Sequence, residues 1–138
     1  MKIRPYQESD EVAVVDLWSD CGLIVPQNDP IRDIQRKLKV NPEWFLVGVD
    51  DTHVIASCMV GYDGHRGWIN YLAVAPSMQR LGLASQIMNE AERLLVAAGC
   101  LKINLQVRTT NEAVVAFYQS LGFKVDDVTS LGKRLEIA

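Results

Sequence analysis

The segment 79–84, Gln-Arg-Leu-Gly-Leu-Ala, constrains the fold most, because a strand pattern gives way there to a long helix pattern. Residues 68–75 are mostly apolar, and residues 83–98 repeat apolar side chains at helical spacing. The first N–H groups of a helix lack intrahelical partners, and the helix dipole attracts negative charge to them. Gly82 and Ala84 keep bulky side chains away from this backbone. We therefore expect the segment to bind a phosphate group through its main chain.

Composition narrows the class of protein. With 138 residues, 49% of them hydrophobic, the chain is predicted to form one domain over 1–138. A net charge of −3 argues against a nucleic-acid partner, and no apolar stretch is long enough to predict a membrane partner. Three widely spaced cysteines and a charged segment 1–8 indicate a cytoplasmic protein without a signal peptide. Two isolated histidines predict no metal site.

Hydrophobic periodicity and turn residues predict the order β-α-α-β-β-β-α-β-α-β-β. Strands are expected at 3–6, 44–49, 54–62, 68–75, 101–107, 123–128 and 131–137. Helices are expected between Ser9 and Gly22, from Pro30 to Asn41, over 83–98, and from Asn111 to Leu121. The fold class is therefore α/β of the α+β kind. Its mixed sheet is antiparallel in the middle, and the long helix forms a right-handed crossover.

Three segments in this order resemble the GNAT superfamily of N-acetyltransferases, including its small uncharacterised bacterial members. They are the strand end at 71–76, the loop Gln79-x-x-Gly82-x-Ala84, and residues 111–123, which follow the pattern N-x-x-A-x-x-F-Y-x-x-L-G-F. The expected element order extends the resemblance over essentially the whole chain. It implies a single-domain GNAT fold whose central strands splay apart.

The resemblance also implies acetyl-CoA as co-substrate and no metal. The pyrophosphate would be held by the backbone of the loop residues Gln79, Arg80, Leu81, Gly82, Leu83, Ala84 and Ser85. The pantetheine arm would bind as an added strand along Leu72, Ala73 and Val74, in the gap beside the strand 101–107. Asn111 would contact the cofactor, although the same residue is also an ordinary helix cap.

The implied reaction is attack of a primary amine on the acetyl thioester, without a covalent enzyme intermediate. Tyr118 would donate a proton to the departing CoA thiolate, although a purely structural tyrosine in the core is the competing interpretation. Many family members carry a glutamate on the central strand as the base, where this chain has Asn70. Asp63, His65, water, or an acceptor that arrives as the free amine all remain open for that role.

Two other functions compete with the enzyme. A non-catalytic acyl-CoA-binding or sensor domain would keep the phosphate loop and dispense with acid and base, and an interaction module would need no cofactor at all. The acceptor stays open among metabolite amines, amino acids, antibiotics, peptide N-termini and protein lysines. The apolar loop residues Leu23, Ile24 and Val25, with Trp68, are expected to line the acceptor pocket or a homodimer contact.

Overall fold

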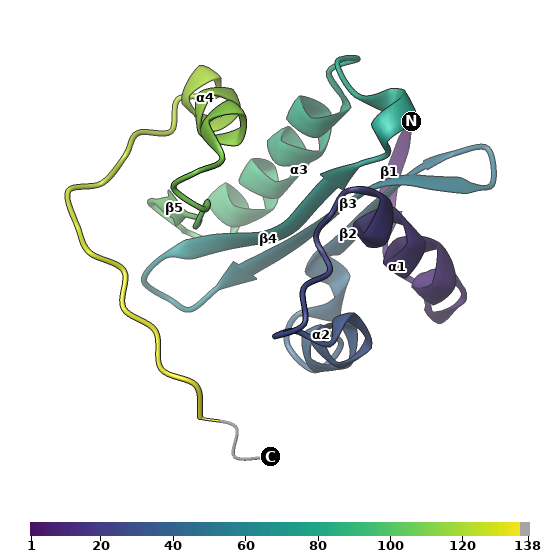
Figure 1. The fold of residues 1–138 in the computed structure, drawn as a ribbon, viewed down its shortest axis with the longest axis horizontal. Helices are drawn as coiled ribbons and strands as arrows, with labels where there is room; N and C mark the ends of the chain where they lie inside the picture. Colours follow the sequence, from purple (N-terminus) through teal and green to yellow (C-terminus); the bar gives the residue numbers. More distant parts are fainter. Residues whose placement is uncertain (136–138) are drawn as a thin grey trace. The chain divides into compact units, whose positions relative to one another are not determined.

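The computed structural model describes residues 1–135 of the chain. The chain divides into two compact units, Met1–Leu105 and Gln106–Ala138. Within the described residues, the first unit contains the sheet and three α-helices, and the second contains the helix α4 (Glu112–Ser120) (Figure 1).

A five-stranded sheet forms the centre of the first unit, in the order β1-β2-β3-β4-β5. The strands are β1 (Lys2–Pro5), β2 (Phe45–Asp50), β3 (His53–Tyr62), β4 (Gly67–Val74) and β5 (Ile103–Asn104). The first four pair antiparallel with their neighbours, whereas β4 and β5 are parallel. A parallel pair needs a crossover, which the long helix between these strands supplies. The predicted mixed sheet is thus confirmed.

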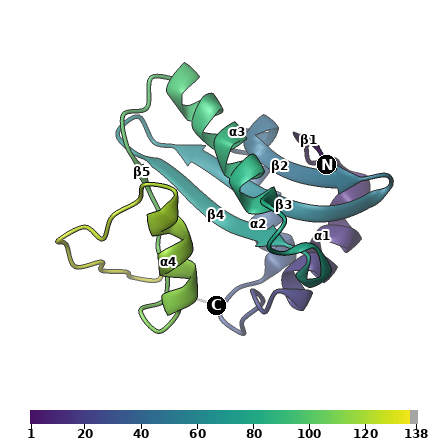
Figure 2. The same ribbon diagram turned by 90° about the horizontal axis from the view of Figure 1, so that it is seen from above.

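Helices cover both faces of this sheet. The helices α1 (Glu11–Asp20) and α2 (Pro30–Lys37) lie on one side and α3 (Leu83–Ala97) on the other (Figure 1). Figure 2 shows α3 running along the sheet, where it contacts β3 and β4. Its apolar stripe at spacings of three and four residues is buried. Within residues 1–135, no helix combines the length and the apolar character needed to cross a bilayer.

The core on the α1/α2 side is built around large aromatic side chains. Trp18 and Phe45 are fully buried there, and Tyr6 stacks on Phe45 with ring centroids 4.5 Å apart. Val14 and Ile34 bring the apolar faces of α1 and α2 onto the same cluster. Burial of this size fixes both helices against the sheet and gives α1 a firm position beside β3 and β4.

The C-terminal part differs from the prediction. After α4 (Glu112–Ser120), residues 121–135 contain neither helix nor strand, so the strand expected at 123–128 is not formed. The strand expected at 131–137 is absent over 131–135, and residues 136 and 137 lie outside the described part. The strand expected at 101–107 is reduced to Ile103–Asn104. A strand requires a partner for its backbone, and apolar alternation in the sequence cannot supply one.

Candidate functional site

The loop between β4 and α3 has an unusual backbone. A short 3-10 helix, Pro76–Met78, follows β4, and Gln79 then extends the chain. Arg80 has φ of 65° and Gly82 has φ of 79°, so two left-handed residues alternate with ordinary ones. The Gln79 side chain turns back, and its Nε2 donates to the carbonyl of Val74 at 3.1 Å. The loop is therefore tied to the end of the strand that precedes it.

This loop leaves the N-terminus of α3 without a cap. Gly82 occupies the N-cap position and provides no side-chain acceptor. Within the described residues, the N–H groups of Leu83, Ala84 and Ser85 have no hydrogen-bond partner, and the first bond of the helix runs from the Gln86 N–H to the Gly82 carbonyl at 3.1 Å. Three adjacent donors at the positive end of a 15-residue helix are an arrangement that favours negative charge.

The helices α2 and α4 show the contrast. The carboxylate of Asp29 accepts from the N–H groups of Ile31 and Arg32, which caps α2. The side chain of Asn111 accepts from the N–H of Val114 at 3.4 Å, which caps α4. The chain thus satisfies two other helix starts with its own side chains and leaves the start of α3 available.

The neighbouring strand has an open edge. β4 pairs with β5 only through Gly67 with Ile103 and Trp68 with Asn104, yet it continues to Val74. The two strands therefore part after two residue pairs. Beyond that point the backbone of β4 has hydrogen-bonding groups and no β5 partner, which is the condition for adding an extended ligand as a strand. Leu72, Ala73 and Val74 lie on this stretch, next to the loop.

Two polar or amphipathic side chains of β4 are exposed on the face that α1 and α2 cover in part. Asn70 pairs directly with Met59, and Trp68 pairs with Gly61 two residues farther along β3. Paired residues share a face, and Met59 belongs to the core cluster on the α1/α2 side. Trp68 is 36% exposed, and Asn70 is exposed as well. The Asn70 side chain on this face ends in an amide, which cannot act as a general base as a carboxylate would.

The Asp63 carboxylate is committed to shaping the turn before β4. It accepts from the backbone N–H groups of Arg66 at 2.7 Å and His65 at 2.8 Å, and from the indole N–H of Trp68 at 3.2 Å. These hydrogen bonds favour the ionised carboxylate and lower the pKa of Asp63 to about 2, and the bond from the Arg66 N–H has the largest effect. A carboxylate that binds a proton so weakly is a poor general base at neutral pH.

In the second unit, α4 carries the other two predicted site residues. Asn111 is the N-cap described above. Tyr118 is 9% exposed, and its ring meets Phe117 and Phe123 edge-on, with centroids 5.2 and 5.5 Å away. The packing role of Tyr118 and the capping role of Asn111 are therefore present.

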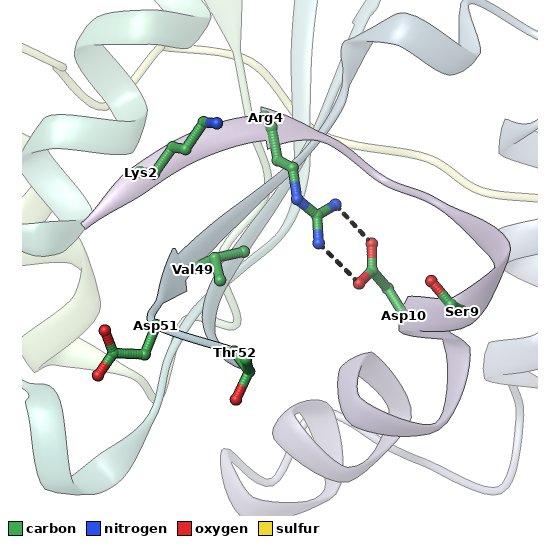
Figure 3. Close-up of a pocket in the computed structure, with 7 residues that line it drawn as sticks. All are labelled: Lys2, Arg4, Ser9, Asp10, Val49, Asp51 and Thr52. Atoms are coloured by element: carbon green, nitrogen blue, oxygen red, sulfur yellow. Dashed lines mark hydrogen bonds and ion pairs between the residues drawn. The ribbon is translucent and has the colours of Figure 1, made fainter.

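A hollow of about 620 Å³ lies elsewhere, beside β1 (Figure 3). It is lined by Lys2, Arg4, Ser9, Asp10, Val49, Asp51 and Thr52, none of which belongs to the predicted site. Figure 3 shows Arg4 and Asp10 facing each other across two hydrogen bonds, 2.8 and 3.0 Å long. This pairing lowers the pKa of Asp10, because the guanidinium hydrogen bonds favour the carboxylate. The charges of Arg4 and Asp10 thus satisfy each other.

The structure also brings forward residues that the sequence analysis missed. Tyr71, in the middle of β4, has φ of 51°, and the register between β3 and β4 shifts beside it. Ser57 and Trp18 are fully buried and hydrogen-bonded around this residue. In the sequence, Ser57 could have indicated this feature, because it is a polar residue inside the apolar run of β3. Among residues 1–135, no three His, Cys, Asp or Glu side chains gather as they would around a metal ion.

Comparison with known proteins identifies the family. Residues 11–123 match the acetyltransferase (GNAT) family. The chain is 44% identical over 135 residues to "Acetyltransferase YE1169" of Yersinia enterocolitica, covering 98% of this chain and 96% of that protein.

Solved structures share the fold at lower identity. Ard1 from Thermoplasma volcanium has a TM-score of 0.77 at 21% identity, covering 91% of this chain and 83% of that one. The structure of AAC(6')-Iy with a bisubstrate analogue that contains CoA has a TM-score of 0.77 at 18% identity, covering 96% and 97%. The family match and the nearly full-length relative establish that this chain belongs to the GNAT family and is an acyl-CoA-dependent N-acetyltransferase.

Proposed function

We propose that residues 1–138 act as one catalytic domain that transfers the acetyl group of acetyl-CoA to a primary amine of a small molecule or peptide. The observation that carries this proposal is the uncapped start of α3, where the N–H groups of Leu83, Ala84 and Ser85 have no partner among the described residues. Family membership makes the chain an enzyme, which disfavours a purely non-catalytic sensor. Three free cysteines agree with a cytoplasmic location.

The loop residues fit a pyrophosphate through their backbone. The chain from Gln79 to Ser85 presents main-chain donors at a positive helix end, and a phosphate oxygen accepts such bonds readily. A Cβ at Gly82 would meet no atom within 4 Å, so the space beside this residue is open to a ligand. The Arg80 side chain adds a positive charge at the same loop.

Two further contacts complete the binding of the co-substrate. Leu72, Ala73 and Val74 bind the pantetheine arm along the open edge of β4, as an added strand. In this proposal Asn111 contacts the cofactor while its side chain caps α4.

Acetyl-CoA brings an activated acyl group, and the protein orients it and stabilises the charge that develops. The amine nitrogen forms a bond to the thioester carbon while the carbon–sulfur bond breaks and its electron pair leaves with sulfur. A backbone N–H of β4 donates to the carbonyl oxygen as negative charge gathers there. The Tyr118 hydroxyl donates a proton to the departing thiolate and regains one from solvent. The proton lost by the amine passes to water.

In this proposal water takes that role, because neither Asn70 nor Asp63 suits it. Asn70 cannot accept a proton at neutral pH, and the hydrogen bonds of Asp63 keep its pKa at about 2. The acceptor must therefore bind in its neutral form. At neutral pH this form is a small fraction of the amine, because the amine pKa is about 10. We expect kcat/KM to rise about tenfold per pH unit from pH 6 to 8. A plateau across that range, measured by thiol release, would show that the protein does supply a base.

Calorimetric titration with acetyl-CoA, CoA and dephospho-CoA tests the binding. We expect micromolar dissociation constants, about −8 kcal/mol, that survive the loss of the 3′-phosphate, because the loop holds the pyrophosphate. A dissociation constant that depends on the 3′-phosphate would move recognition away from the loop. No heat with any of the three ligands would refute the proposal.

A further inference from the structure

The central strand β4 contains a bulge at the point where it parts from β5. In its ladder with β3, Ser57 pairs with Ala73 and Met59 pairs with Asn70. Two residues of β4, Tyr71 and Leu72, therefore stand opposite one residue of β3. Tyr71 adopts φ of 51°, a left-handed conformation that an aromatic residue seldom takes. A strained residue of this kind persists only where its surroundings hold it.

A buried hydrogen-bond chain holds the backbone of Tyr71. The Ser57 hydroxyl donates to the Tyr71 carbonyl at 2.8 Å, and its oxygen accepts from the indole N–H of Trp18 at 2.9 Å. Ser57 and Trp18 both have 0% exposure. Because water is excluded, only one orientation of the Ser57 hydroxyl satisfies the indole N–H of Trp18, the carbonyl of Tyr71 and the hydroxyl itself. The Tyr71 carbonyl is thereby fixed in direction.

The side chain of Tyr71 is held from two helices. Its ring stacks on the indole of Trp18, with centroids 3.8 Å apart. Its hydroxyl donates to the carboxylate of Asp33 on α2 at 2.6 Å. Burial, followed by this hydrogen bond, raises the pKa of Tyr71, so the hydroxyl stays protonated and remains a donor. The bulge is thus fastened to β3, α1 and α2 together.

The direction of the Tyr71 carbonyl also determines the direction of the Leu72 N–H. The described residues contain no cis peptide, and in a trans peptide the C=O and N–H point in opposite directions. Because the Tyr71 carbonyl points to Ser57 on β3, the Leu72 N–H points away from Ser57. It belongs to the stretch of β4 that has no β5 partner.

We propose that Ser57 and Trp18 are positioning residues for acetyl transfer, which hold the Tyr71–Leu72 peptide so that the Leu72 N–H donates to the thioester carbonyl oxygen. This inference rests on the proposed function, in which a β4 backbone N–H stabilises that oxygen. Neither side chain touches the substrate. Each acts through the direction of one peptide group, and loss of the Ser57 hydroxyl releases that group.

The test measures polarisation of the carbonyl directly. The probe is acetyl-CoA labelled with ¹³C at the carbonyl carbon, and isotope-edited infrared difference spectra report its stretching frequency when bound. A hydrogen bond lowers this frequency. In Ser57→Ala we expect a higher frequency than in the wild type, while the dissociation constant for acetyl-CoA changes by less than about threefold. Trp18→Phe keeps an aromatic ring at this position and removes the indole donor, at some loss of buried volume, so its frequency should lie between the two.

Cys58→Ala is the matched control. Cys58 is the next residue of β3 and is also fully buried, so its truncation lowers stability without touching the chain of hydrogen bonds around Tyr71. Its bound carbonyl frequency should equal that of the wild type. Equal frequencies in Ser57→Ala and the wild type would overturn the inference, as would an equal shift in Cys58→Ala. If Ser57→Ala does not fold, Trp18→Phe decides by the same criterion.

Failure of the proposed function has a different signature. The wild-type protein would then bind no labelled acetyl-CoA, and no bound carbonyl band would be seen in any variant.

Discussion

Replacement of Gly82 by alanine separates backbone strain from ligand recognition. Gly82 has φ of 79°, and an alanine Cβ there would meet no atom within 4 Å. The substitution therefore introduces left-handed strain without a steric clash. That strain amounts to about 1 kcal/mol, which lowers the melting temperature by about 4 °C for a chain of this size.

The effect on binding should be larger than the effect on stability. Relief of the strain rotates the Gly82 peptide and turns the adjacent N–H groups away from a bound pyrophosphate. A hydrogen bond to a charged group contributes about 1.5–3 kcal/mol, so the loss of one weakens CoA binding about 10- to 100-fold. Calorimetric titration with CoA measures this loss, and thermal unfolding measures the strain.

Gly99→Ala is the matched control at the other end of α3. Gly99 has φ of 89°, and a methyl group at this residue would again meet no atom within 4 Å, so the cost in stability should be similar. Its CoA affinity should equal that of the wild type. Equal losses of affinity in both variants would show that the effect comes from general destabilisation. An unchanged affinity in Gly82→Ala, at the expected loss of stability, would refute pyrophosphate binding at this loop.

Four other substitutions have distinct expected results. Tyr118→Phe should lower kcat at least tenfold and leave acetyl-CoA affinity within about threefold, and equal losses in both would remove Tyr118 from the proton-donor role. Asp10→Asn should lower stability by about 1–3 kcal/mol at pH 7. Because the pKa of Asp10 is lower in the folded state than in the unfolded state, its ionised carboxylate stabilises the fold. This stabilisation is complete above the unfolded-state pKa of about 3.9 and is lost as the pH falls through the folded-state pKa. Urea unfolding from pH 6 to 2 should therefore show a shallower decline in the variant, and parallel curves would contradict this reasoning. The Ile24 side chain is 39% exposed, so Ile24→Ala should change acceptor KM without a change in melting temperature. Leu23 packs on the core, so Leu23→Ala should lower the melting temperature. Unchanged acceptor kinetics in Ile24→Ala would exclude Ile24 from the acceptor site.

The loop at 79–84 was predictable because its signals are local. The strand pattern, Gly82 and the apolar stripe of α3 lie within one stretch of chain, and the structure has a strand, a left-handed glycine and a helix in that order. The cap of α4 by Asn111 was predictable for the same reason. Its contact with the cofactor, like the role of Tyr118, stays a prediction.

The bulge at Tyr71 was not predictable in this way. An aromatic residue in an apolar run favours extended backbone, and the left-handed conformation is imposed by Ser57 and Trp18, which are distant in sequence. The segment 123–128 shows the converse. Its apolar residues suggest a strand, but a ladder needs a second segment, and none pairs with it in the described part of the chain.

The donors at the start of α3 belong to the main chain, which every amino acid carries. In the function we propose, selection on this site acts on the path of the backbone, so side chains around Gly82 can vary while the acetyl donor stays the same. In that proposal Asn70, exposed on β4, can vary with the acceptor, whereas Trp68 is held by its hydrogen bond to Asp63. A lineage built on this chain can change what it acetylates without inventing a new way to hold the acetyl donor.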